Sequence, residues 1–103
     1  MSRLAKLMSL HGADPGDADV LYMIAQEHAK AGAQAEAVRW YDRCLGASPE
    51  YHYAYFHKAR SQQAAGDVAG AAATAAQGLK RAVAAGNAKA ASELAALVDE
   101  LEG

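Results

Sequence analysis

Four histidines are the residues of this sequence best suited to binding a metal ion: His11, His28, His52 and His57. Two ligands on one helix face must stand about four residues apart, but His52 and His57 are five apart and so point to different faces. No carboxylate or thiol is placed beside a histidine pair to complete a site. The sequence therefore predicts no metal site, and we expect no cofactor.

Nucleophilic chemistry has little support either. Cys44 is the single cysteine, and its place among small residues on a helix predicts a buried, reduced, unreactive thiol. Gly66 and Gly70 are separated by an expected helix start, so they do not form a phosphate-binding loop, and no nucleophile elbow occurs. We predict that the protein is not an enzyme. A small-molecule-binding or catalytic protein with a closed pocket is kept as a third hypothesis.

Two helical segments on either side of Gly32 organise the chain, from Asp17 to Pro49. Apolar residues recur in both segments at i, i+3, i+4 and i+7, the spacing of an amphipathic helix. Asp17 or Asp19 can cap the first helix, Gly32 can end it in a left-handed conformation, and Ser48-Pro49 can stop the second. The stretch therefore predicts a helical hairpin. The apolar positions are Leu21, Ile24, Ala25 and His28, then Ala37, Val38, Tyr41, Cys44 and Leu45.

The hairpin recurs at an offset of 34 residues, which preserves packing roles as well as residue types. In this alignment, aromatic residues pair where a core must be filled, small residues pair where helices approach closely, and glycines pair where the chain turns. The matched pairs are Tyr22 and Phe56, Ala25 and Ala59, Gly32 and Gly66, Ala37 and Ala71, and Leu45 and Leu79. A period of this length in a helix-turn-helix unit is typical of the tetratricopeptide repeat, and the chain resembles that family.

The first copy carries most of the family pattern, and the second departs from it. Leu21 stands at the usual Trp position, Ile24-Ala25 at the Leu-Gly pair and His28 at the usual Tyr. In the second copy Lys58 replaces the apolar Leu and Ala75 the aromatic residue of the second helix. The resemblance implies an all-α fold, a right-handed superhelical stack of antiparallel helical hairpins.

The period divides the chain, which we interpret as a single domain over residues 1–103. We expect an N-terminal half-repeat helix at residues 2–11, a first repeat at 17–50, a second at 51–85 and a capping helix at 87–102 with a polar outer face. The alternative for residues 2–11 is a disordered tail, because Arg3 stands where the repeat has a small residue.

The resemblance implies that the first helices of successive repeats line a concave groove that receives a peptide or helix of another protein. Tyr22 and Phe56 are expected side by side, with Gln26 and Arg60 available for hydrogen bonds. In the alternative interpretation, Tyr22, Tyr53 and Phe56 only pack between helices. The predicted partner-binding residues are Asp19, Tyr22, Gln26, Lys30, Tyr53, Phe56, Arg60 and Gln63.

Charge and hydropathy exclude other partners. The net charge of -2 gives no electrostatic footprint for nucleic acid or an anionic membrane. No apolar run approaches the ~20 residues that span a bilayer, and the N-terminus has no secretory signal. We expect a soluble cytoplasmic protein.

Two functions fit these observations. The first is a protein-interaction adaptor or scaffold, whose groove binds a segment of another protein. The second is a self-associating structural module, such as a homodimer, in which the N-terminal half-repeat or the aromatic residues from Tyr51 to Tyr55 pair with another copy.

Overall fold

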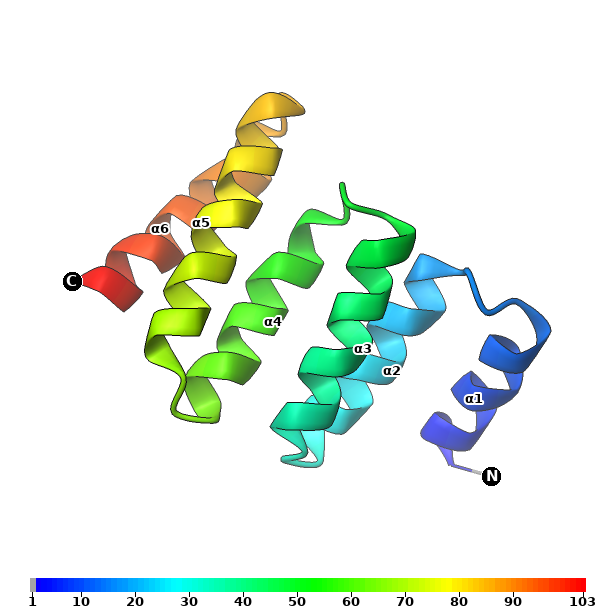
Figure 1. The fold of residues 1–103 in the computed structure, drawn as a ribbon. Coiled ribbons are helices and arrows are strands. Elements are labelled where there is room, and N and C mark those ends of the chain that lie inside the picture. The colour runs from blue at the N-terminus through cyan, green and yellow to red at the C-terminus, as the bar shows by residue number, and fades with distance from the viewer. Residues whose placement is uncertain (1) are drawn as a thin grey trace.

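The computed structural model describes residues 2–103 and contains six helices, with no strand in this range. The helices are α1 (Arg3–Ala13), α2 (Ala18–Lys30), α3 (Gln34–Ala47), α4 (His52–Ala64), α5 (Val68–Ala84) and α6 (Ala88–Glu102). They stack side by side into a slab of 42 × 30 × 18 Å, with α1 and α6 at opposite ends (Figure 1). The predicted all-α fold class is confirmed.

The helix ends follow from local chemistry. The Asp17 carboxylate accepts hydrogen bonds from the backbone N–H groups of Asp19 and Val20, so Asp17 is the cap of α2. Gly32 and Gly66, 34 residues apart, have φ angles of 80° and 87°, the left-handed conformation that favours glycine. Asn87 caps α6 through the backbone N–H of Ala90. Equivalent turns therefore separate the helices of both hairpins.

The first hairpin, α2–α3, has a core built around Tyr41. This side chain is 1% exposed and lies in one cluster with Leu21, Ala25 and Cys44, which Ala54 of α4 completes. Burial raises the pKa of the Cys44 thiol to about 12. The prediction of a buried Cys44 is confirmed, and a thiol with this pKa stays protonated and weakly nucleophilic at neutral pH.

In the second hairpin, α4–α5, the large aromatic core residue belongs to the first helix, α4, and not to the second. Tyr55 of α4 is buried and donates a hydrogen bond to the Pro49 carbonyl at 2.9 Å. It lies against Gly78 of α5, where an added Cβ would stand 2.5 Å from the Tyr55 Cβ. Tyr55 shares a cluster with Leu94 of α6. Helix α6 is therefore part of the core of this hairpin.

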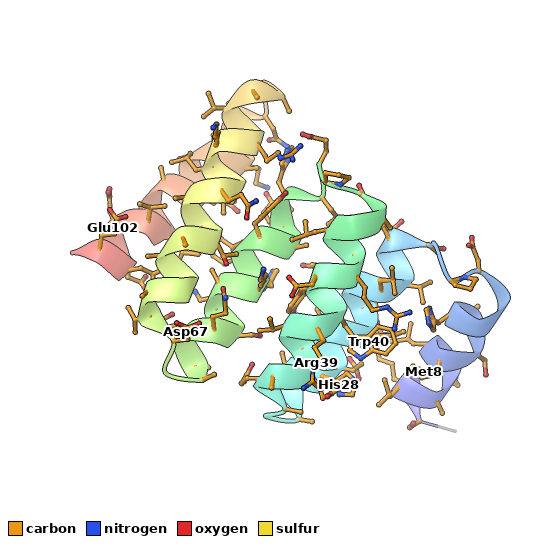
Figure 2. All side chains as sticks on the ribbon, in the orientation of Figure 1. Met8, His28, Arg39, Trp40, Asp67 and Glu102 are labelled. Atoms are coloured by element: carbon orange, nitrogen blue, oxygen red, sulfur yellow. The ribbon has the colours of Figure 1, made fainter. Side chains whose placement is uncertain are left out.

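Helix α1 packs on α2 and reaches Ala13, two residues beyond the expected end at His11. Leu7 is buried against Val20 and Ile24. The His11 ring also meets the Trp40 ring of α3 edge-on at 5.2 Å. Figure 2 shows Trp40 and His28 together on the side of the stack that faces Met8 of α1. Contacts with both α2 and α3 thus hold α1 on the first hairpin.

None of the helices within residues 2–103 combines the length and the apolarity that crossing a membrane would require.

Candidate functional site

The even-numbered helices form a continuous row. Helix α4 contacts α2 on one side and α6 on the other, whereas the backbones of α1, α3 and α5 do not approach one another within the described chain. A stack whose even helices approach and whose odd helices spread apart is curved, with α2, α4 and α6 on the inner side. We call this side the inner face. The eight predicted partner-binding residues all belong to α2 and α4.

An aromatic row joins α2 to α4. The His57 ring lies between the two predicted platforms, with its centroid 5.7 Å from that of Tyr22 and 5.3 Å from that of Phe56. Tyr22 also lies 4.9 Å from Tyr51, the residue before α4. Neither His57 nor Tyr51 was among the predicted residues. His57 aligns with Met23 of the first repeat, so the repeat alignment gave no signal for it.

These rings belong partly to the core and partly to the surface. Tyr22 packs against the cluster of Tyr41, and Phe56 packs against the clusters of the second hairpin, yet both are only partly buried. Burial raises the pKa of Tyr22, and burial together with the Arg60 guanidinium lowers the pKa of His57. His57 is therefore a neutral ring at physiological pH.

Asp19 is engaged within the fold. The Tyr51 hydroxyl donates a hydrogen bond to Asp19 Oδ1 at 2.8 Å. Burial and this hydrogen bond to a carboxylate raise the pKa of Tyr51. Asp19 thus fixes the start of α4 against α2, and a partner would meet it as an occupied acceptor.

Arg60 is also occupied, by a residue that the sequence did not indicate. Its Nη1 and Nη2 atoms donate to the two carboxylate oxygens of Glu100 in α6, at 2.5 and 3.3 Å. Nη1 also donates to Gln63 Oε1 at 3.0 Å, and the guanidinium lies 5.5 Å from the centroid of Phe56. The hydrogen bond from Arg60 lowers the pKa of the Glu100 carboxyl. The Arg60 cation is therefore neutralised by α6.

The remaining predicted residues separate into two groups. Lys30 pairs with Glu27 of its own helix at 3.1 Å, and Glu27 also pairs with Arg3 of α1 at 3.3 Å, so Lys30 and Arg3 share one carboxylate. Gln26 and Tyr53 are half-buried and form no side-chain hydrogen bond with any residue in 2–103. Their polar groups are available to a partner.

Hollows of the surface lie elsewhere. One of about 390 Å³ is lined by Gln77, Lys80, Arg81 and Ala84 of α5. A second of about 240 Å³ lies where α5 turns into α6, and none of the predicted residues lines either. Across residues 2–103, no three His, Cys, Asp or Glu side chains gather as metal ligands would.

Comparisons with solved structures agree on the fold. A tetratricopeptide repeat domain protein from Salinibacter ruber, in a solution NMR structure, is 30% identical with a TM-score of 0.80, and the match covers 87% of this chain and 91% of that one. A crystal structure of a tetratricopeptide repeat domain protein from the same organism gives 29% identity and a TM-score of 0.76, over 84% of this chain and 98% of that one.

A protein of Bordetella parapertussis shares the fold at 20% identity and a TM-score of 0.85, over 99% of this chain and 89% of that one. Neither the models of known protein families nor the curated proteins give a match.

Proposed function

The chain belongs to the tetratricopeptide repeat family, and from this premise we propose that it is a protein-interaction module whose inner face binds a peptide or helical segment of another protein. The observation that carries the proposal is the aromatic row of Tyr22, His57 and Phe56, which crosses from α2 to α4 and is only partly buried. Aromatic side chains are frequent anchors of protein interfaces.

The polar groups beside this row favour an uncharged segment. Gln26 and Tyr53 have free hydrogen-bonding groups, which suit the backbone or an amide side chain of a partner. Arg60 is paired with Glu100, so an acidic partner must displace that carboxylate before it can bind. We therefore infer that the bound segment presents apolar and hydrogen-bonding groups to the inner face.

The fold and the charge of the protein also bear on where and how it acts. We infer a cytoplasmic adaptor or scaffold that acts by binding alone, without catalysis. The net charge of -2 supports a protein partner rather than nucleic acid or an anionic membrane surface.

The test is selection of ligands from a displayed peptide library, followed by titration of the isotope-labelled protein with the selected peptide. We expect the backbone amide signals of Gln26, Tyr53 and Gln63 to shift most. The double variant Gln26→Ala/Tyr53→Ala should weaken binding by about tenfold or more while keeping the circular dichroism spectrum. These side chains suit the test because they form no side-chain hydrogen bond within residues 2–103.

A matched control is Gln77→Ala, which removes an exposed amide from α5. It should bind the selected peptide as the unchanged protein does. Shifts confined to α3 and α5, or an equal loss of affinity in the control, would show that the ligand binds the outer side instead.

A further inference from the structure

The helices at the two ends of the stack each have one open face. Among residues 2–103, the backbone of α1 contacts only α2, and that of α6 contacts only α5 and α4. Leu10 of α1 is 54% exposed, although Cys44, at the same repeat position in α3, is 0% exposed. Cys44 lies in the core between α2 and α3. In a complete hairpin such as α2–α3, the second helix packs on the first through this face. In α1 the same face is exposed.

Helix α6 has the complementary face. Aligning the residues that precede α2, α4 and α6 places Ala91 at the position of Leu21 and Tyr55, and Ala95 at the position of Ala25. In the first hairpin, Leu21 and Ala25 form the surface that receives α3. Ala91 and Ala95 are half-buried, and no helix of the described chain lies on them as α3 lies on α2. Helix α6 thus resembles a first helix without its partner.

An apolar hollow lies beside this face of α6. It has a volume of about 240 Å³ and is lined by Ala82, Val83, Gly86, Asn87, Ala88 and Ala91. All but one of these residues are apolar or glycine, and Val83 is exposed. The hollow is large enough for one branched apolar side chain.

We propose that α6 of one molecule binds α1 of a second copy of this chain, so that the two helices form a hairpin shared between molecules. In the antiparallel register of α2 and α3, Leu10 of the second copy faces Ala91 and the hollow. This pairing obeys the size rule of the hairpins within the chain. Leu21 shares a cluster with Cys44, and Tyr55 contacts Gly78, so a large residue meets a small one at this level each time.

The charges of the two helices are complementary in the same register. Helix α1 carries Arg3 and Lys6 and no acidic residue, whereas α6 carries four acidic residues against the single Lys89. The register places Lys6 within one helical turn of Asp99. At the other end of the shared hairpin it places Asp14, which follows α1, beside Lys89. Opposite charges therefore meet at both ends of the shared hairpin, which favours the antiparallel orientation over the parallel one.

The geometry also defines the type of assembly. Two different faces meet, so the contact is heterologous and leaves one open α1 and one open α6 at the ends of each assembly. Figure 2 shows Met8 of α1 and Glu102 of α6 at opposite ends of the molecule, so molecules add end to end. A single helix pair buries less than the ~1,200 Å² of standard interfaces, so association should be weak. The inner face takes no part in it.

Sedimentation equilibrium of the full chain from micromolar to millimolar concentration tests the proposal. We expect the average mass to rise continuously above the 10.7 kDa of the chain and to pass twice that value. Leu10→Asp should lower the association constant by about tenfold or more. Val68→Asp is the matched control, because Val68 is an apolar residue of α5 that is 48% exposed. It should associate as the unchanged protein does.

A charge exchange tests the register. Lys6→Glu alone and Asp99→Lys alone should each weaken association, and an equimolar mixture of the two variants should restore it, because each α1 then meets an α6 of opposite charge. Lys80→Glu, the same change on exposed Lys80 of α5, should have no effect. A mass of 10.7 kDa at every concentration, equal losses in Leu10→Asp and Val68→Asp, or a mixture no better than its components would each overturn the proposal.

Discussion

The first hairpin, α2–α3, places its large aromatic core residue, Tyr41, on the second helix, whereas the second hairpin, α4–α5, places Tyr55 on the first. Tyr55 requires Gly78 opposite it, at the position that Cys44 holds in the first hairpin. At the level of this pair, Tyr55 with Gly78 and Leu21 with Cys44 therefore fill a similar space with different residues. Cores tolerate such exchanges when the total volume is kept.

A second difference concerns what completes each core. The position of Tyr41 is held in the second hairpin by Ala75, which is too small to fill the same space. Leu97 of α6 lies in the cluster of Ala59, Ala71 and Ala75 and fills it instead. The Tyr41 cluster takes its large buried side chains from α2 and α3, whereas the Ala75 cluster takes its large buried side chain from α6. We infer that the second hairpin depends on α6 for its stability.

The largest expected effect is that of Tyr41→Ala, which removes the central side chain of the first hairpin. Loss of a buried aromatic ring costs about 3 to 5 kcal/mol, a large part of the ~5 to 15 kcal/mol that stabilise a typical domain. Urea denaturation followed by circular dichroism measures the free energy of unfolding. Tyr53→Ala, which truncates a half-buried tyrosine on α4, is the control and should cost much less. Equal losses would mean that Tyr41 does not organise the core.

Leu97→Ala tests the dependence of the second hairpin on α6. The substitution leaves a cavity beside Ala75, and we expect a loss of about 2 to 5 kcal/mol. Amide hydrogen exchange measures where the loss falls: protection should decrease most in α5 and α6, and least in α2 and α3. A uniform decrease over all helices would show that the two hairpins unfold only as one unit.

The size matching of Tyr55 and Gly78 can be tested by a double-mutant cycle. Gly78→Cys alone forces a Cβ to within 2.5 Å of the Tyr55 Cβ and should destabilise the protein by about 1 to 3 kcal/mol. Tyr55→Leu alone leaves a cavity. The double variant recreates the Leu21 and Cys44 pair of the first hairpin, so its cost should be lower than the sum of the single costs by about 1 kcal/mol or more. Additive costs would mean that the residues are not size-matched.

Much of the fold could be predicted from the sequence because local chemistry specifies it. Asp17 and Asn87 cap helices through their own side chains, and Gly32 and Gly66 supply the left-handed turns. The burial of Cys44 followed from helical periodicity. The role of Gly78 could not be predicted in this way, because it depends on which side chain of another helix lies opposite it.

The candidate site was harder to predict from the sequence, again because it depends on contacts between helices. The repeat alignment selected positions on α2 and α4, but it did not show that Glu100, 40 residues after Arg60, neutralises the guanidinium. That contact depends on how α6 packs against α4, which no local pattern encodes. Tyr22 was selected as a binding residue, yet its ring also packs on the first core. Its use as a core residue and as a surface residue follows from tertiary packing alone.

The smallest expected effect concerns His57, which joins the two hairpins. Its ring lies 5.7 Å from Tyr22 and 6.5 Å from Tyr41 of the first hairpin, and the first hairpin has Met23 at the same repeat position. Burial, with the Arg60 cation, lowers the pKa of His57 below its ordinary value of 6.5. The unfolded chain therefore binds a proton as the pH falls through 6.5 while the folded chain does not, and the free energy of unfolding decreases.

His57→Met removes this titration while keeping an apolar side chain of similar length. The variant should lose less stability than the unchanged protein between pH 7.5 and pH 5, as measured by urea denaturation at both values. The comparison of slopes isolates His57, because all other ionisable groups are common to both proteins. If both proteins lose the same stability between these pH values, His57 accepts a proton in the folded state at no cost. Water then reaches this ring between the two hairpins.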